Sequence, residues 1–418
     1  MSLSVIEFEK RVAAAERLEG KGATMAKKRF EKNGKQTARE RIKLAIDFGS
    51  EFFELSSLAA FNMYGGETHS AGVVTGIGKI NKSFCMIFSN EGAVKGGTWV
   101  EPSCRKVLRA QQIALACNLF CVYIVDSGGA FLPDQANVYP ELFGRIFRNQ
   151  AEMSSIHGLL QIAVVVGLST AGGAYVPAMC DFVIITETGS SIFLAGPPLV
   201  KSATGEIVTA EDLGGGPMHT RVSGVADYLA KDENEALGPI LKNIIQMTLS
   251  VNIVSNNLFS TKQKRILFES NGIGISSFLP SGRLLETWAP VSDEAFSKVA
   301  KWLDSDVPLV IMEKQWGFLN EGVTKGVGEF IKALARVKHK VGIVTGGTAA
   351  LCISSKGFNP GFFFIWPDVK FETSKGIMDS YMSTAIINDD GIIHPDSTNS
   401  IINTCLQVFR ATDNQASL

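Results

Sequence analysis

Two adjacent glycines are the first residues of this sequence with an evident chemical use. Gly172 and Gly173 lie in "STAGGAYVPAM" (169–179), between the apolar runs "QIAVVVGL" and "CDFVIITET". If a strand ends and a helix begins there, the first helical N–H groups have no intrahelical acceptor. Such donors stabilise a developing oxyanion, and glycine lets a ligand approach the backbone closely. The same glycines would also allow close packing of a strand on a helix without any ligand.

Basic residues that could meet phosphate groups lie at a predicted junction of loop and helix. Lys95 lies in "VKGGT", and Arg105, Lys106 and Arg109 lie in "CRKVLRA". Cationic side chains and free N–H groups at such a junction bind phosphate. The alternative is an exposed basic face of a helix. Asp126 follows a buried run and is expected to cap the turn "SGGA" rather than act as a base.

Other common catalytic patterns do not occur. His219 and His394 have no partner at ligand or triad spacing and are expected to be ordinary polar residues. The sequence has no P-loop, no H-E-x-x-H, no G-x-S-x-G, and no G-x-G-x-x-G opening a first strand–helix unit. Neither a metal site nor a dinucleotide site is therefore predicted.

Composition excludes several classes of protein. The 418 residues are 45% hydrophobic and 19% charged, with a net charge of -1, which favours a globular α/β protein and no nucleic-acid partner. The seven cysteines contain no Cys-x-x-Cys, so neither disulfides nor a zinc ribbon is expected. Cys117 and Cys121 are expected to pack in the core from one apolar helix. No secretory segment or membrane span is visible, so the sequence predicts a cytoplasmic or mitochondrial-matrix protein.

A unit of strand, glycine turn and helix recurs along the chain. It occurs at 119–133 and 159–196, and again at 306–320 and 339–371, where "VGIVTGGTAAL" parallels "AVVVGLSTAGGA". Alternating strands and helices favour parallel strands covered on both faces. Two similarly folded lobes are therefore expected. The predicted segments are a helical segment (1–50), a first lobe (51–255), a linker of lost periodicity (256–295) and a second lobe (296–418).

Three long blocks resemble one enzyme family. They are "VDSGGAFLPDQANVYPELFGRIFRNQAEMSS", "STAGGAYVPAM" and "IFLAGPPLVKSATGEIVTAEDLGG". These blocks resemble the carboxyltransferase (β) subunits of biotin-dependent acyl-CoA carboxylases, in the branch of the methylcrotonyl-CoA and geranyl-CoA carboxylases. The resemblance runs from about residue 35 to residue 250. It implies an α/β fold of two tandem crotonase-like lobes, each a ββα repeat of the ClpP/crotonase superfamily.

The resemblance also implies a mechanism and a set of site residues. The first lobe would bind a coenzyme A thioester, with amides of Gly172 and Gly173 on the thioester oxygen. The second lobe of a neighbouring subunit would bind carboxybiotin, with Gly347 and Ala349 near its ureido oxygen. Carboxybiotin would give up CO2, the biotin anion that remains would remove the acyl proton, and the resulting enolate would take up the CO2. The other residues expected to contact either group are Lys95, Gly96, Gly97, Arg105, Gly128, Gly129, Ala130, Phe131, Ala174, Gly346 and Thr348.

The implied partners are a biotin carboxylase/biotin carrier α subunit, which would supply the carboxybiotin, and further copies of this chain. The oligomer would be a dimer with shared sites or a trimer of dimers.

The second half departs from the family pattern. It is shorter, its turn "GGTAALCIS" lacks the Gly-Ala-Gly that donates to biotin, and His394 stands where an aspartate is usual. Two alternatives to biotin-dependent transfer follow. One is a biotin-independent acyl-CoA enzyme, such as a decarboxylase working through an enolate. The other is a non-catalytic subunit that keeps the fold as an interface.

Overall fold

The computed structural model describes twelve ranges of the chain: 3–19, 21–32, 34–251, 263–269, 272–278, 284–289, 292–303, 307–313, 324–345, 356, 359–373 and 376–416. The contacts divide the chain into two compact units. The first unit comprises 11–255 with 415–418, and the second comprises 256–414 with 1–10. Each unit has its own sheet, and the first carries the glycine turn at 172–173.

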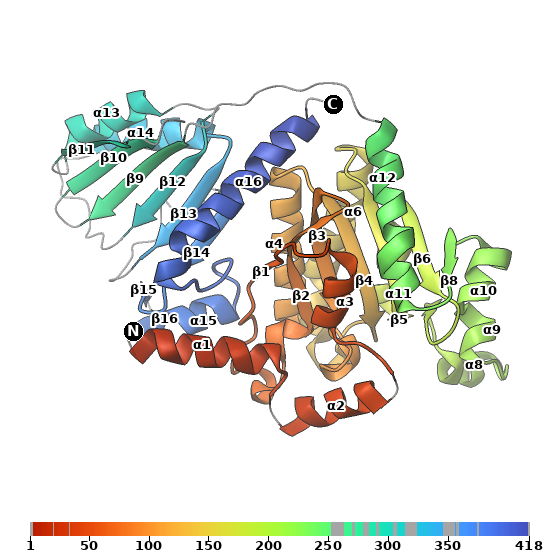
Figure 1. Cartoon of the computed structure of the whole chain (residues 1–418). Coiled ribbons are helices and arrows are strands. Elements are labelled where there is room, and N and C mark those ends of the chain that lie inside the picture. The colour runs from red at the N-terminus through yellow and green to blue at the C-terminus, as the bar shows by residue number, and fades with distance from the viewer. Residues whose placement is uncertain are drawn as a thin grey trace. The chain divides into compact units, whose positions relative to one another are not determined.

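The first unit is built on a mixed sheet of strand order β1-β2-β3-β4-β5-β6-β8, with β7 beside β5 (Figure 1). β1, β2 and β3 pair antiparallel, whereas β3, β4, β5, β6 and β8 pair parallel. The parallel packing expected from the sequence therefore covers only part of the sheet. Its strands are β1 (Phe53–Leu55), β2 (Val73–Ile80), β3 (Ser83–Asn90), β4 (Phe120–Ser127), β5 (Gln161–Thr170), β6 (Phe182–Thr186), β7 (Ser191–Phe193) and β8 (Tyr228–Ala230).

The antiparallel pair β2 and β3 is closed by a tight turn. Asn81 and Lys82, the two residues between the strands, have φ of 47° and 68°. A two-residue hairpin of this kind has positive φ at both central positions, because that backbone twist matches the twist of the flanking strands. The local sequence therefore joins these strands directly, without the crossover helix that a parallel pair would need.

The helices are α1 (Leu3–Glu16), α2 (Lys21–Lys32), α3 (Ala38–Ala45), α4 (Glu101–Ala116), α5 (Gln135–Val138), α6 (Gly144–Ser155), α7 (Tyr175–Ala178), α8 (Pro197–Thr204), α9 (Ala210–Gly214), α10 (Gly216–Met218), α11 (Glu233–Glu235) and α12 (Leu241–Val251) in the chain up to residue 251. Helix α3 begins with a capping box. The Thr37 side chain accepts from the Glu40 N–H, and the Glu40 carboxylate accepts from the Thr37 N–H. This cap fixes where α3 starts and hence which of its residues face the sheet.

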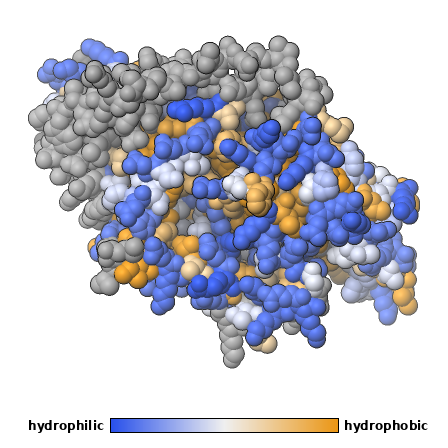
Figure 2. Space-filling model, viewed as in Figure 1, coloured by the Kyte–Doolittle hydropathy of each residue, from blue (hydrophilic) through white to orange (hydrophobic). Residues whose placement is uncertain are grey.

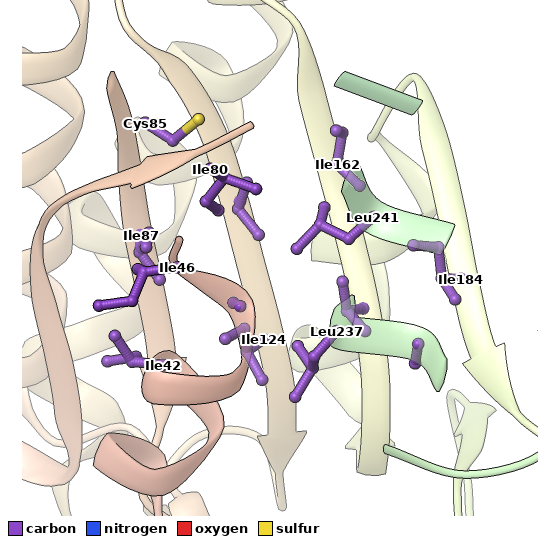
Figure 3. Close-up of a cluster of buried hydrophobic side chains, with 14 of the residues drawn as sticks. Ile42, Ile46, Ile80, Cys85, Ile87, Ile124, Ile162, Ile184, Leu237 and Leu241 are labelled. Carbon is purple, nitrogen blue, oxygen red and sulfur yellow. The ribbon is translucent and has the colours of Figure 1, made fainter. Parts of the chain in front are cut away.

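A hydrophobic core lies between the sheet of the first unit and the helices on one of its faces. Figure 3 shows Ile42 of α3 and Ile46 directly after it, together with Leu237 of the π-helical turn Ala236–Ile240 and Leu241 at the start of α12, over side chains of the sheet. The sheet residues labelled there are Ile80, Cys85, Ile87, Ile124, Ile162 and Ile184. In the view of Figure 2, the described surface is largely hydrophilic, with apolar residues in small groups. The strand ends that carry the glycine turns are therefore anchored in a continuous core.

The second unit has a sheet of order β11-β10-β9-β12-β13-β14, in which β9, β12, β13 and β14 pair parallel. The chain between 256 and 295, predicted as a linker, instead contains three strands, β9 (Gln263–Glu269), β10 (Gly272–Phe278) and β11 (Leu284–Ala289). Apolar and polar residues do not alternate regularly along these three segments of the sequence, so sequence reasoning missed them. The remaining elements are α13 (Asp293–Trp302), β12 (Leu309–Glu313), α14 (Thr324–Arg336), β13 (Lys340–Val344), β14 (Phe362–Ile365), β15 (Lys370–Thr373), β16 (Gly376–Asp379), α15 (Ser380–Ala385) and α16 (Thr398–Ala416).

Cys117 and Cys121 do not share a helix, contrary to the sequence prediction. Cys117 follows the last residue of α4, and Cys121 lies in β4, although both are fully buried as expected. Asn118, with φ of 46°, ends the helical path between them, because a left-handed residue cannot continue a right-handed helix. Six of the seven cysteines lie among the described residues, and all six are free thiols. None of the helices seen in the described ranges is long and apolar enough to cross a membrane.

Candidate active site

Two glycine turns meet at the carboxyl ends of the neighbouring parallel strands β4 and β5. The first, with Gly128 and Gly129, follows β4, and the second, with Gly172 and Gly173, follows β5. A Cβ atom added at Gly173 would lie 3.7 Å from the Gly129 Cα. A Cβ atom added at Gly129, whose φ is +86°, would lie 2.7 Å from the carbonyl oxygen of Thr170. The turns therefore contact each other at the sheet edge where α/β proteins usually bind ligands.

The first turn is held by the segment that precedes α4. The Gly128 N–H donates to the Gly96 carbonyl oxygen at 3.0 Å, and the Trp99 N–H donates to the Gly129 carbonyl oxygen at 2.8 Å. The Phe131 N–H donates to the Trp99 carbonyl oxygen at 2.9 Å. These bonds bring together most of the residues that the resemblance assigns to the first lobe: Lys95, Gly96, Gly97, Gly128, Gly129, Ala130 and Phe131.

The two turns offer backbone donors rather than ionisable side chains. The Gly129 N–H is already bonded to the Ser127 Oγ at 3.1 Å. The Ala130 N–H has no acceptor within the described part of the chain. At the second turn, a 3-10 segment from Ala171 to Ala174 leads into α7. Gly172 is open, since a Cβ atom there would meet only the Phe143 Cζ, at 4.0 Å.

Lys95 is the cation next to the first turn. Its side chain is exposed, and its Nζ lies 5.0 Å from the centre of the Phe131 ring. A cation over an aromatic face is attracted to the ring and keeps its donors available to solvent. Lys95 therefore stands at the rim of the site, where an anionic ligand could reach it.

A row of aromatic side chains lies beside the second turn. We call Trp99, Phe143, Phe147 and Tyr175 the aromatic row; its successive ring centres are each 5.5 Å apart. Tyr139 also packs on Phe143, with ring centres 5.7 Å apart. Sequence reasoning missed these residues, although the spacing of four between Tyr139, Phe143 and Phe147 places three rings on one helical face. A π-helical turn (Tyr139–Phe143) joins α5 to α6 there, and such turns often occur at functional sites.

A narrow, mainly apolar cavity lies directly beside Gly173. Its walls include Phe88, Tyr123, Val125 and Val176. Trp99 also lines it, and the buried Trp99 Nε1 has no hydrogen-bond acceptor among the described residues. The space has room for little more than one water molecule, so it can take a small group but not a charged one.

The basic residues of α4 do not form one exposed face. Arg105 is half exposed and forms an ion pair with Glu101, with Nη2 and Oε1 2.6 Å apart. Lys106 and Arg109 are buried, so the exposed-face alternative is wrong for both. The Lys106 Nζ donates to the Ser70 carbonyl oxygen at 3.1 Å, and burial lowers the pKa of this lysine to about 7. The Lys106 side chain therefore packs in the protein interior and is not part of an exposed basic face.

A carboxylate of the protein already occupies the start of α4. Asp134 accepts from the Glu101 N–H and from the Tyr64 hydroxyl, each at 2.7 Å. Burial raises the pKa of Tyr64, and its hydrogen bond to Asp134 raises it further. Burial would raise the pKa of Asp134, but these hydrogen bonds lower it overall. A phosphate at this junction would therefore meet Lys95 rather than the first N–H groups of α4.

Asp126 does not cap the first turn, contrary to the sequence prediction. Ser127 provides that hydrogen bond, since its hydroxyl is one residue closer to the turn. The Asp126 carboxylate instead forms an ion pair with Arg41, with Oδ2 and Nη1 3.0 Å apart. His219 is also structural, with Nε2 2.7 Å from the Ile192 carbonyl oxygen. His394 caps a short helix by accepting from the Asp396 N–H.

Four residues predicted to contact biotin from the second lobe, Gly346, Gly347, Thr348 and Ala349, lie outside the described residues, so their roles remain predictions. In the ranges that the structure covers, no cluster of histidine, cysteine and carboxylate side chains could hold a metal ion.

Comparison with known proteins identifies the family. The model of the carboxyl transferase domain matches residues 29–267. This chain belongs to the carboxyl transferase family. Among its relatives is the biotin-dependent 3-methylcrotonyl-coenzyme A carboxylase β1 subunit of Mycobacterium tuberculosis, 54% identical over 218 residues. That match covers 52% of this chain and only 41% of the relative.

Longer matches extend into the second unit. The mitochondrial methylcrotonoyl-CoA carboxylase β chain of Arabidopsis thaliana is 33% identical over 92% of this chain and 82% of its own length. The crystal structure of the P. aeruginosa geranyl-CoA carboxylase β subunit superposes with a TM-score of 0.83 at 26% identity, over 98% of this chain and 93% of that one. The resemblance and the crotonase-like α/β fold expected from the sequence are thus confirmed.

Proposed function

We propose that this chain is the carboxyltransferase component of a biotin-dependent acyl-CoA carboxylase that acts on an enoyl-CoA of the 3-methylcrotonyl type. The observation that carries the proposal is the contact between two glycine turns at the ends of β4 and β5. They form a site of backbone donors, and among the described residues the atoms nearest to a Cβ atom placed at Gly172 or Gly173 belong to Phe143, Ser127 and Gly129, none of which is ionisable. The names of the relatives agree with this reaction. The proposed compartment is the cytoplasm or, as for the plant relative, the mitochondrion.

The two turns would bind the thioester oxygen as it gains negative charge. Gly172 and Gly173 supply amides from one turn, and the Ala130 N–H, which has no acceptor of its own in the described chain, supplies one from the other. Donors fixed before the reaction stabilise the enolate without reorganisation, and removing one such donor costs about 3–4 kcal/mol in comparable enzymes.

The base and the carboxyl group would both come from carboxybiotin when it is bound. The residues expected to hold it, 346–349, lie outside the described part of the chain. On the acyl-CoA side, the reaction needs positioning and electrostatics but no titrating residue.

The surroundings of the turns match the two ends of an acyl-CoA. Lys95 lies at the rim, where it could meet a phosphate of the coenzyme, and Ala174 follows the second turn directly. The aromatic row and the small apolar cavity lie beside Gly172 and Gly173, and the cavity has room for one small group of an acyl chain at most. An uncharged, flat acyl group suits such walls, because transfer of apolar surface from water is favourable and aromatic rings have flat faces.

The direct test is transfer of labelled carboxylate from carboxybiotin to a panel of acyl-CoAs. Product with 3-methylcrotonyl-CoA or a longer relative is expected. Gly173→Val should abolish transfer, because a side chain at this position would keep the thioester oxygen away from the amides of the turn. The protein should stay folded, because the first added carbon would meet its neighbours only at ordinary distances of 3.5–3.7 Å. Gly144→Ala is the matched control: it lies in α6 with open space around it and should keep full activity. Unchanged activity of Gly173→Val would refute the oxyanion assignment.

The altered glycine turn of the second lobe, "GGTAALCIS" (346–354), supports a second candidate function. If the chain binds acyl-CoA tightly but transfers no carboxylate, it is either a biotin-independent enzyme of enolate chemistry or a non-catalytic subunit. Loss of CO2 from a malonyl-type thioester would identify the first, and its absence the second.

We further propose that the working form is a homo-oligomer that associates with a biotin-carrying α subunit, as the relatives' description as β subunits suggests. If light scattering shows a monomer and that monomer has full transfer activity, this assembly is refuted.

A further inference from the structure

Asp126, at the end of β4, ties together the segments that support both glycine turns. Its side chain is buried, with 4% of the residue exposed. The Oδ1 atom accepts from the Leu168 N–H at 3.2 Å, and the Oδ2 atom lies 3.0 Å from the Arg41 Nη1. The Lys35 Nζ is 3.8 Å from the same Oδ2. One carboxylate therefore bonds to β5 through one oxygen and to α3 through the other.

The contact with β5 falls on an irregularity of that strand. Val125 pairs with Val165, but Ser127 pairs with Ser169, so β5 holds two more residues than β4 over this stretch. Gly167 lies in the bulge, and a Cβ atom there would be 2.1 Å from the Asp126 Oδ1. The carboxylate thus occupies the place of a side chain at 167. A bulge redirects the strand that follows it, and the strand here leads straight into the second turn.

The backbone of Asp126 also restricts where the first turn can lie. A Cβ atom at Gly97 would lie 2.0 Å from the Asp126 carbonyl oxygen, so the segment before α4 packs directly against this residue. Ser127, the next residue, accepts from the Gly129 N–H. Any shift of Asp126 therefore moves the first turn as well as the second.

Arg41 is the fixed end of this arrangement. It is fully buried on α3, whose start is set by the Thr37 capping box. Its guanidinium also binds both carboxylate oxygens of Glu233, at 2.7 and 3.0 Å. A buried charge with two carboxylate partners in a fixed fork geometry holds its position firmly.

We propose that Asp126 is a positioning residue for the carboxyl transfer proposed above: held by Arg41, it fixes the β5 bulge and the β4 end so that the amides of both turns point to one oxyanion. This inference rests on the proposed function. Asp126 touches no reacting atom, and it acts through the position of the amides. Misplacement of a catalytic group by about 1 Å can cost roughly 100-fold in rate.

The test compares Asp126→Asn with Glu233→Gln in the whole 418-residue chain, assayed with its carboxybiotin donor. Both variants keep side-chain volume and remove one carboxylate from the same Arg41. Only the first faces the turns. We expect Asp126→Asn to lower kcat by about 10- to 100-fold with KM for acyl-CoA within about threefold. Glu233→Gln should lower kcat by at most about threefold, because its amide oxygen still accepts from Arg41 and Asp126 keeps its own bonds to Arg41 and Leu168, despite a comparable loss of thermal stability.

Hydrogen–deuterium exchange gives a readout that needs no turnover. Asp126→Asn should speed exchange of amides in 127–131 and 168–174, whereas Glu233→Gln should not. If Asp126→Asn does not fold, Arg41→Lys, which keeps the charge but loses the fork, should show the same pattern more weakly.

Equal losses of kcat in Asp126→Asn and Glu233→Gln, or unchanged exchange in both turns of folded Asp126→Asn, would overturn the inference. Absence of turnover in the wild type would instead refute the proposed function, and the exchange comparison would still test the positioning.

Discussion

Gly96 and Gly97 offer a comparison in which backbone strain and steric overlap can be separated. Their φ values are +66° and +67°, so alanine at either position adopts the same unfavourable left-handed conformation. This strain costs about 1–2 kcal/mol for a residue with a Cβ atom. A Cβ atom at Gly96 has no neighbour within 4 Å, whereas one at Gly97 lies 2.0 Å from the Asp126 carbonyl oxygen. Ordinary contact begins at 3.4 Å, so Gly97→Ala must move the new Cβ atom and the Asp126 carbonyl oxygen apart by about 1.4 Å.

Overpacking of this kind adds about 1–3 kcal/mol or more, because the atom that must move is a main-chain carbonyl at the end of β4. We expect Gly96→Ala to lose about 1–2 kcal/mol of unfolding free energy. Gly97→Ala should lose at least about 2 kcal/mol more. Equilibrium urea unfolding of the two variants and the wild type, followed by circular dichroism at one pH, measures both losses. Equal losses would refute the packing of this loop on Asp126.

Two further predictions concern lysines. The pKa of Lys106 is lowered from 10.5 to about 7 in the folded protein, so between these pH values only the unfolded chain carries the extra proton. Unfolding free energy should therefore fall as pH falls from 10.5 to 7, with a slope of up to about 1.4 kcal/mol per pH unit, and level off below 7. Lys106→Met should remove this slope in pH-dependent urea unfolding; an unchanged slope would show that Lys106 is charged throughout. Lys95→Ala should raise KM for acyl-CoA by about tenfold, since a contact between the lysine and a phosphate contributes roughly 1–2 kcal/mol. The same variant should leave KM unchanged for the same acyl group on a pantetheine fragment that carries no phosphate. Arg105→Ala, which loses a side chain already paired with Glu101, should change KM less, and an equal effect would place Arg105 at the phosphates instead.

The sequence alone determined the core elements and the first glycine turns. Apolar runs that end in Gly-Gly mark β4 and β5, because buried parallel strands need apolar residues on both faces and a sharp exit needs glycine. The blocks around Gly128 and Gly172 also identified the family, which the comparisons confirmed. The apolar runs and the family blocks are both local patterns, so they can be recognised from the sequence without knowledge of tertiary contacts.

Tertiary structure decided what the charged and aromatic residues do. Lys106 and Arg105 are neighbours in sequence, but packing of α4 buries one and exposes the other. Asp126 lies one residue from the turn, yet its carboxylate is directed to Arg41, 85 residues away along the chain.

The aromatic row likewise gathers Trp99 and Tyr175 from distant segments around Phe143 and Phe147. Contacts of this kind depend on which faces the fold brings together. Residue type and spacing cannot specify them, because the partners of a buried charge or ring are set by the whole packed unit.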